Sequence, residues 1–363
     1  MKICLIGDNL SNLVLAKILL GRKIKIDLFY ELPKNRNNTS RTIGITQDNM
    51  DYIKNNIFNL KDLSWPIKKI KVFNESNRIN EILKFGSNET KLFSVIKYNE
   101  LYNKLTSFLK KEKNFKKYEI KKNLSFSKLI KKKYNLIING KKNNKLVKNN
   151  FFNIVNKDYN STAHTVLINH KKCENTTAIQ IFTKLGPIAF LPISNYKTSI
   201  IFSVLDEKVN LENINIKELI NKYNYNYKIK SFGKFEKFKL KYYFPRNYYF
   251  QNILMFGDAL HQIHPLAGQG FNMTLRDIKI FIKLIDEHLE LGLPLDKGIL
   301  IKFEKKIKHL NFIFSNSIDF IHEFFKFDNK FDNKISNHVF KLFSKNKLIN
   351  KYVEDFANKG INL

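Results

Sequence analysis

Three glycines, one proline and two histidines are gathered in residues 257–272. The apolar run 253–256 before them predicts a strand, and an apolar-periodic segment from Phe271 to Leu291 predicts a helix after them. Glycines at a strand-to-helix turn let backbone N–H groups approach a ligand, and a helix N-terminus carries about half a positive charge. These residues therefore predict a binding site for a ligand that carries phosphate, ribityl or ring oxygens.

The segment 253–277 resembles the second FAD-binding motif of flavoprotein aromatic hydroxylases. The amino-acid sequence of this segment is similar to that of the ubiquinone-biosynthesis hydroxylases (UbiH/UbiF type, with a p-hydroxybenzoate hydroxylase-like fold). The resemblance implies that Asp258 bonds the ribityl chain, that Pro265 lies against the flavin ring, and that the 268–270 turn donates to its pyrimidine end. A helix N-terminus suits this position because a reduced flavin is anionic. The cofactor-binding residues expected in this segment are Gly257, Asp258, Pro265, Gly268, Gln269, Gly270 and Asn272.

A second cofactor element is predicted at the beginning of the chain. Residues 2–6 and 24–30 are apolar enough for two strands, separated by a turn at Gly7 and an apolar-periodic segment 10–20. Glu31 follows directly after the second strand. The order of strand, turn, helix, strand and acidic residue is that of a dinucleotide-binding unit. A carboxylate accepts hydrogen bonds from both hydroxyls of a ribose, and the resemblance assigns Glu31 to the adenosine ribose.

The glycine fingerprint of that unit is altered. The pattern Gly-x-Gly-x-x-Gly is replaced by Gly7-Asp8-Asn9-Leu10-Ser11-Asn12. Asparagine tolerates left-handed backbone angles, so Asn9 is expected to keep the turn while its side chain crowds the pyrophosphate. Asn12 stands where glycine permits close packing of helix on strand, and Asp8 places an anion near the expected diphosphate. The cofactor-binding residues expected here are Gly7, Asn9 and Asn12.

Further residues take their roles from the same resemblance. Arg41 and Asn99 are expected to contact the cofactor. After the predicted strand 134–138, Asn139 replaces the acid of an Asp-Gly pair that serves both FAD and the pyridine nucleotide in many flavin hydroxylases. We expect the replacement of the acid by Asn139 to affect reduction of the flavin by NAD(P)H more than it affects the fold. The residues expected at the substrate cavity are Pro187, Leu191, Pro192 and His264.

The predicted fold class is α/β, with a Rossmann-like FAD-binding domain, an inserted mostly antiparallel β-sheet substrate domain and C-terminal helices. Other predicted strands are 67–73, 79–85, 165–168, 178–182 and 198–204, and the predicted helical tail covers 300–314 and 318–327. The FAD-binding domain is expected in three parts, 1–66, 96–155 and 251–298, the last with the flavin motif. Substrate-domain strands are expected at 67–95, the substrate-binding sheet at 156–250 and a helical region at 299–363.

The composition is strongly basic, with 64 Lys and Arg against 32 Asp and Glu and a formal net charge of +32. Such a charge attracts polyanions, which raises nucleic acid and anionic membranes as partners. However, only six of the basic residues are arginine, the side chain suited to bidentate phosphate and base recognition. Abundant Lys, Asn, Ile and Phe are also what an AT-rich coding sequence produces. Compositional drift is therefore the preferred explanation, membrane-surface attraction is the next, and no nucleic-acid partner is expected.

The sequence contains no clear spacing of residues for a metal site or for nucleophilic catalysis. His261 and His264 are three apart without a further ligand set, and Cys4 and Cys173 have no metal spacing. Two cysteines indicate a reducing compartment without disulfides, and the lack of a run of about twenty apolar residues argues against a membrane span. We therefore expect no metal, and a cytoplasmic chain that is peripherally associated with the inner membrane and leaves the chemistry to its cofactor.

The resemblance implies a monooxygenase that uses FAD, NAD(P)H as electron donor and dioxygen to hydroxylate a polyprenylated phenol in ubiquinone biosynthesis. Expected partners are that substrate, a quinone-biosynthesis protein complex and the membrane surface. The protein itself is expected to position the substrate and the flavin, to exclude water from the reacting oxygen and to stabilise charge at the flavin. We therefore name no catalytic acid or base. Two alternatives stay open. One is a basic nucleic-acid-binding protein, and the other is a catalytically degraded scaffold subunit, favoured by Asp8, Asn9, Asn12 and Asn139.

Overall fold

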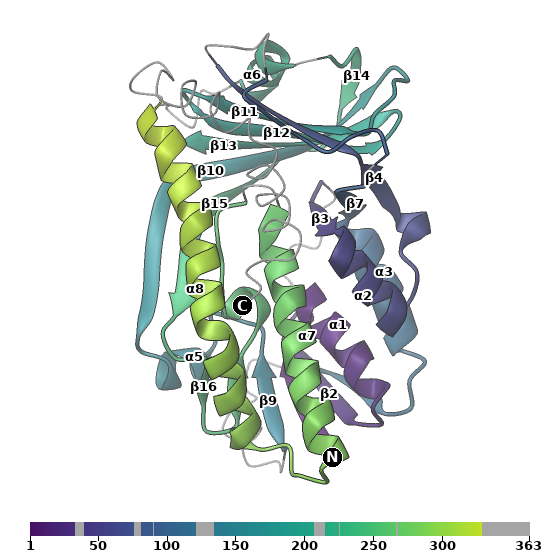
Figure 1. Cartoon of the computed structure of the whole chain (residues 1–363), viewed down its shortest axis with the longest axis vertical. Coiled ribbons are helices and arrows are strands. Elements are labelled where there is room, and N and C mark those ends of the chain that lie inside the picture. Colours follow the sequence, from purple (N-terminus) through teal and green to yellow (C-terminus); the bar gives the residue numbers. More distant parts are fainter. Residues whose placement is uncertain are drawn as a thin grey trace.

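Three β-sheets and the helices between them make up the structure, a computed structural model that describes residues 1–32, 40–75, 81–89, 91–120, 134–206, 215–224, 226–265 and 268–328. The largest sheet lies at one end of the long axis and a parallel sheet toward the other, with two long helices running lengthwise (Figure 1). The predicted fold class, α/β with a mostly antiparallel sheet inserted, is confirmed.

The first sheet has six strands in the order β16-β17-β9-β1-β2-β8 and is parallel except at β16. The central strand β1 is buried from Ile3 to Ile6, as expected of a parallel sheet covered on both faces. Helix α1, Leu10–Leu20, follows β1, so the predicted strand–turn–helix–strand order is present. The strand bounds are Lys2–Ile6 (β1), Lys25–Tyr30 (β2), Phe115–Glu119 (β8), Leu136–Asn139 (β9), Tyr249–Phe250 (β16) and Ile253–Met255 (β17).

The largest sheet has eight strands, with the path β14-β10-β13-β12-β11-β5-β6 and β15 paired to β10. Its pairs are antiparallel except β5 with β11. Buried side chains such as Phe190 and Phe202 pack with those of α6, Ile216–Tyr223. The strand bounds are Lys69–Asn74 (β5), Leu83–Phe85 (β6), Ile154–His170 (β10), Thr177–Thr183 (β11), Gly186–Ser194 (β12), Lys197–Leu205 (β13), Ile229–Phe232 (β14) and Glu236–Pro245 (β15).

A third sheet was not expected from the sequence. It joins β3, Thr42–Thr46, through β7, Phe93–Lys97, to β4, Ser64–Ile67. The predicted strand 67–73 is therefore divided, because Ile67 ends β4 and β5 begins at Lys69. Of the predicted strand 79–85, β6 covers the last three residues, and Ile79 and Asn80 lie outside the described residues.

The two long helices are α7, Gln269–Glu290, and α8, Lys297–Asp328. The predicted helical tail over 300–314 and 318–327 is confirmed, and it forms one helix, because α8 runs through 315–317 without a break. Ser315 is tolerated there since its buried hydroxyl donates to the Phe312 carbonyl at 3.1 Å. The rest of the predicted helical region, 329–363, lies outside the described residues. The remaining helices are Gln47–Asn56 (α2), Tyr98–Leu109 (α3), Lys145–Asn150 (α5), Lys61–Leu63 (η1) and Gly257–Ala259 (η3).

Candidate functional site

Three strands of the parallel sheet end side by side, and a glycine follows each of them. Gly7 follows β1, Gly140 follows β9, and Gly257 comes shortly after β17. The φ angles of Gly7 and Gly257 are 100° and 57°, which favour glycine. In open α/β sheets, ligands bind outside the carboxyl ends of the strands. This edge is therefore the candidate site, and it holds the predicted cofactor residues Gly7 and Gly257.

The two asparagines in place of fingerprint glycines hold the β1–α1 turn together. Asn9 is the N-cap of α1: its Oδ1 accepts from the Asn12 N–H at 3.0 Å, and its Nδ2 donates to the Gly140 carbonyl at 2.8 Å. Asn12 is fully buried, and its Nδ2 donates to the carbonyls of Ile6 and Gly7 at 2.9 and 2.7 Å. A Cβ on Gly140 would lie 2.7 Å from the Asn9 amide nitrogen. Because Gly140, which follows the neighbouring strand β9, has no side chain, the Asn9 and Asn12 amides can pack closely against its backbone.

The acidic groups near the β1–α1 turn, Asp8 and Glu31, are paired with lysines. The Lys117 ammonium lies 3.3 Å from Asp8 Oδ2, and the Tyr102 hydroxyl donates to the same oxygen at 2.9 Å. The Lys141 ammonium lies 3.1 Å from Glu31 Oε2. Glu31, the predicted ribose ligand, therefore faces a lysine of the same chain.

Tyr98, the first residue of α3, lies among segments that carry predicted cofactor residues. The Arg41 guanidinium lies 4.5 Å from the centre of its ring. Burial raises the pKa of the Tyr98 phenol, the Arg41 charge opposes this, and the Asp258 charge adds to it. Sequence reasoning named Asn99, the next residue, and missed Tyr98.

The first turn of α7 has no side-chain cap in the described part of the chain. Its N-cap, Gly268, is left-handed with φ 63°, and its N–H donates to the Pro265 carbonyl at 3.3 Å. A Cβ on Gly270 would meet nothing within 4 Å, and Oε1 of the buried Gln269 has no hydrogen-bond partner within the described ranges. Asp258 is exposed and, among the described residues, has neither a hydrogen-bond nor an ion-pair partner. Backbone donors, a positive dipole end and a free carboxylate are thus available to a ligand.

Asn272, also predicted to bind the cofactor, uses its side chain inside the protein. Its Oδ1 accepts from the Thr46 N–H at 3.0 Å and from Asn49 Nδ2 at 3.1 Å, and its Nδ2 donates to the Gly44 carbonyl at 3.0 Å. The residue is 1% exposed. Asn272 therefore fixes the beginning of α7 against β3 and α2.

The glycine loop is anchored to both long helices by a buried polar network. His261 Nε2 donates to Asp277 Oδ2 of α7 at 2.6 Å, and Asn311 Nδ2 of α8 donates to Asp277 Oδ1 at 3.0 Å. The side chains of His261 and Asp277 are 1% and 2% exposed. Within the described residues, no three His, Cys, Asp or Glu side chains gather as a metal site. His261 is thus engaged in positioning the loop.

His264 is placed between the large sheet and α8. Its ring stacks on His322 at 4.2 Å between centroids, and Tyr159 of β10 meets it edge-on at 5.2 Å. His264 is 1% exposed, and neither ring nitrogen has a hydrogen-bond partner among the described residues. Burial, and then the neighbouring His322, lower the pKa of His264, and burial likewise lowers the pKa of His322.

These two histidines predict a loss of stability in mild acid. Burial holds both pKa values below the ordinary value of 6.5, at which an unfolded histidine takes up a proton. The stabilisation by the neutral rings is therefore complete above that pH and is lost below it, and the free energy of unfolding falls by up to about 1.4 kcal/mol per pH unit for each ring. The variant His322→Phe keeps an aromatic ring in place and should show a shallower slope in urea unfolding at pH 7, 6 and 5, because His264 and His164 still contribute. Equal slopes in the variant and the wild type would contradict this assignment.

The predicted substrate-cavity residues lie in two places. Pro187, Leu191 and Pro192 are on β12, and Leu191 packs against a cluster that contains Ile67 of β4. His264 instead lies beside Tyr159 and α8.

Two hydroxyl pairs that sequence reasoning missed join the start of β3 and the residues just before it to the large sheet. The Thr42 hydroxyl donates to Ser199 Oγ at 2.9 Å, and the hydroxyls of Ser40 and Thr165 lie 2.8 Å apart. These bonds fix the segment that carries Arg41. No periodic or motif signal marked them, because the partners are far apart in the chain.

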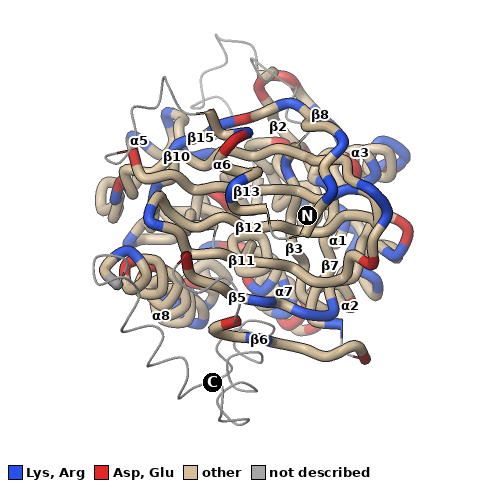
Figure 2. The backbone as a smooth tube through the Cα atoms, turned by 90° about the horizontal axis from the view of Figure 1, so that it is seen from above, with Lys and Arg blue, Asp and Glu red and all other residues tan. Residues whose placement is uncertain are grey.

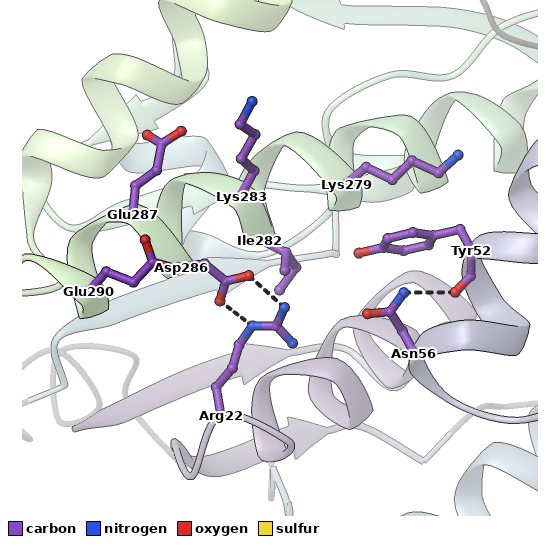
Figure 3. A pocket seen from close by; sticks show the side chains of 9 residues that line it. All are labelled: Arg22, Tyr52, Asn56, Lys279, Ile282, Lys283, Asp286, Glu287 and Glu290. Carbon is purple, nitrogen blue, oxygen red and sulfur yellow. Dashed lines mark hydrogen bonds and ion pairs between the residues drawn. The ribbon is translucent and has the colours of Figure 1, made fainter.

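A surface depression of about 370 Å³ lies along the C-terminal half of α7 (Figure 3). Arg22 and Asp286 form a two-pronged ion pair there, with 2.6 Å between Nη2 and Oδ2. Burial raises the pKa of the Tyr52 phenol to about 12, and the Lys279 ammonium lies 5.2 Å from the centre of its ring. The lining includes none of the predicted site residues and its ion pair is already satisfied. We therefore assign the candidate site to the glycine loop.

The two ends of the candidate site differ in their fit to FAD. At the α7 end, the described residues leave backbone donors uncapped, Asp258 unpaired and the space beside Gly270 open, which suits the flavin ring and ribityl chain. At the α1 end, the Asn12 N–H and the carboxylates of Asp8 and Glu31 are already bonded within the protein. The flavin end therefore fits, and the diphosphate end does not fit as the turn stands.

Charged residues are spread over the molecule. Figure 2 shows Lys and Arg on several strands and helices with acidic residues among them, rather than in one band on this face. In the described ranges, no helix combines the length and apolar character needed to cross a bilayer.

Comparison with known proteins gives a family and several relatives. A family model described as squalene epoxidase matches residues 145–351, more than half of the chain. The mitochondrial ubiquinone biosynthesis monooxygenase COQ6 of Drosophila melanogaster is 25% identical over 190 residues, which cover 42% of this chain and 40% of that protein. The 3-demethoxyubiquinol 3-hydroxylase of Escherichia coli K12 is 26% identical over 172 residues, covering 43% and 42%. The chain thus spans less than half the length of these relatives.

Solved structures show the same architecture at low identity. The p-nitrophenol 4-monooxygenase PnpA from Pseudomonas putida DLL-E4 superposes with a TM-score of 0.79 at 9% identity, covering 99% of this chain and 98% of that chain. PqsL from Pseudomonas aeruginosa gives a TM-score of 0.69 at 12% identity, covering 90% and 96%. At such identities the similarity establishes the fold alone.

Proposed function

Because this chain belongs to the squalene epoxidase family of FAD-dependent monooxygenases, we propose that it hydroxylates the ring of a polyprenylated phenol in ubiquinone biosynthesis. Relatives named as ubiquinone hydroxylases support this substrate class. The observation that carries the proposal is Asp258, exposed and unpaired among the described residues, beside the uncapped first turn of α7. When bound, FAD would supply the oxygen-activating chemistry, with NAD(P)H as electron donor and dioxygen as co-substrate.

The chain's own residues would position the flavin and the substrate. Asp258 would accept hydrogen bonds from ribityl hydroxyls, and the first N–H groups of α7 would stabilise negative charge at the pyrimidine end. Pro265 would lie against the ring. The cavity residues proposed on the large sheet and the loop are Pro187, Leu191, Pro192 and His264. The other proposed cofactor contacts are Gly7, Glu31, Arg41, Asn99, Gly257 and Gln269, whereas the side chains of Asn9, Asn12 and Asn272 are bonded within the protein.

A lipid-tailed substrate favours peripheral contact with the cytoplasmic face of an inner membrane. Helix α8 exposes Phe312 and Phe320, at 55% and 70%, and carries the exposed lysines Lys305 and Lys306. Each lysine near an anionic leaflet contributes about 1 kcal/mol. Apolar and basic side chains on one helix thus support this location and membrane partner.

A scaffold subunit of a quinone-biosynthesis complex is the second candidate function. It is favoured by the closed α1 end, where Asn9 occupies the N-cap and Asp8 is paired with Lys117. Such a subunit would bind FAD weakly and contribute contacts rather than hydroxylation.

The test is complementation of bacterial strains that each lack one ring-hydroxylation step. The wild-type chain should restore quinone in one strain, with the matching unhydroxylated precursor disappearing from the mass spectrum of the lipid extract. The Asp258→Ala variant should leave that precursor in place. Precursor accumulating in every strain, with the protein present at normal level, would favour the scaffold function.

A further inference from the structure

The N-terminus of α1 is closed by side chains of the protein itself. The Asn12 N–H donates to Asn9 Oδ1 at 3.0 Å. Helix N-terminal N–H groups are the donors that hold a dinucleotide diphosphate in a Rossmann-type unit. One of these donors is therefore already satisfied.

The Asn9 amide is held from both sides. While its oxygen caps α1, its nitrogen donates to the Gly140 carbonyl at 2.8 Å, so the side chain bridges the ends of β1 and β9. A diphosphate in this gap would have to break both bonds. It would also leave the Gly140 carbonyl, an acceptor, facing an anion.

The charged side chains around the β1–α1 turn are also paired within the protein. Lys141 pairs with Glu31 at 3.1 Å, and its Cγ lies 3.1 Å from where a Cβ on Gly7 would be, so the lysine runs over the turn. The ammonium of Lys117 is engaged by Asp8 at 3.3 Å. The lysines that could neutralise a diphosphate at this edge therefore have partners in the protein.

We propose that Asn9 makes this site select against the diphosphate of a dinucleotide, so that the flavin ring and ribityl chain supply most of the affinity. The inference rests on the proposed function, because it concerns the same flavin site. It predicts that riboflavin, which lacks a diphosphate, binds almost as tightly as FAD. It further predicts that removal of the Asn9 side chain opens the site to the diphosphate.

The experiment titrates riboflavin and FAD into the apoprotein and follows quenching of flavin fluorescence. For the wild type, the two dissociation constants should agree within about threefold. Asn9→Gly should tighten FAD binding by about tenfold or more, the effect of a hydrogen bond to a charged group, and leave riboflavin binding unchanged. Glycine substitutes for asparagine at an N-cap with little loss of helix stability, so the variant is expected to fold.

The matched control is Asn215→Gly, which removes the N-cap side chain of α6 on the large sheet. It should leave both affinities unchanged, and a gain equal to that of Asn9→Gly would overturn the inference. FAD bound about a hundredfold more tightly than riboflavin by the wild type would overturn the inference and leave the proposed function standing. FAD binding gained by the variant when the wild type binds no flavin would support the inference and contradict the proposed function. Absence of flavin binding in every variant would overturn both.

Discussion

Replacing Asp258 with alanine is expected to remove flavin from the purified protein while leaving the fold unchanged. Asp258 follows β17 at the candidate site and, in the described part of the chain, bonds to no other residue. Hydrogen bonds to a charged group contribute about 1.5–3 kcal/mol, which corresponds to about 10- to 150-fold in the dissociation constant. Because the side chain is exposed, its loss should change the unfolding free energy by less than about 0.5 kcal/mol. The readouts are bound flavin absorbance and urea unfolding.

Two further variants separate the causes. Asp258→Asn keeps an acceptor and removes the charge, so its flavin affinity should lie between those of the wild type and Asp258→Ala. Asp62→Ala removes another exposed aspartate, in η1, and should change neither quantity. Full retention of flavin by Asp258→Ala would show that the carboxylate does not bind the cofactor.

Replacing Asp277 with alanine should destabilise the protein by about 3–5 kcal/mol. Asp277 is 1% exposed and accepts from His261 at 2.6 Å and from Asn311 at 3.0 Å. Without the carboxylate, the donors of both partners are left buried and unsatisfied. The loss should appear as a lower urea midpoint with an unchanged slope.

Asp286→Ala is the control on the same helix. Asp286 also pairs with a basic group, Arg22, but the two side chains are 35% and 23% exposed. A surface pair contributes about 1 kcal/mol or less, because water screens it and solvates the freed partner. Similar losses for the two aspartate variants would contradict the assignment of Asp277 as the buried anchor of the glycine loop.

The sequence by itself determined the elements whose signals are local. The order β1, α1, β2 follows from short apolar runs around Gly7, and α7 follows from a glycine-rich start and a stop near Gly292. Strand alternation predicted pieces of β10, β11 and β13, and these elements together with the resemblance to flavin hydroxylases predicted the fold class. Periodicity and turn residues act over a few positions, so they can be read without knowing the tertiary fold.

The tertiary structure alone decided which polar groups of the candidate site are engaged. Asn9 could be predicted to crowd a diphosphate, but its second partner, Gly140, is 131 residues away. Likewise, Asp8 meets Tyr102 and Lys117, whereas Asp258, with a similar sequence context beside a glycine, has no such partner among the described residues. Hydrogen bonds and ion pairs depend on distances of about 3 Å between segments that only the folded chain brings together. For this reason the sequence could indicate a flavin site, and the fold determined which of its two ends is open.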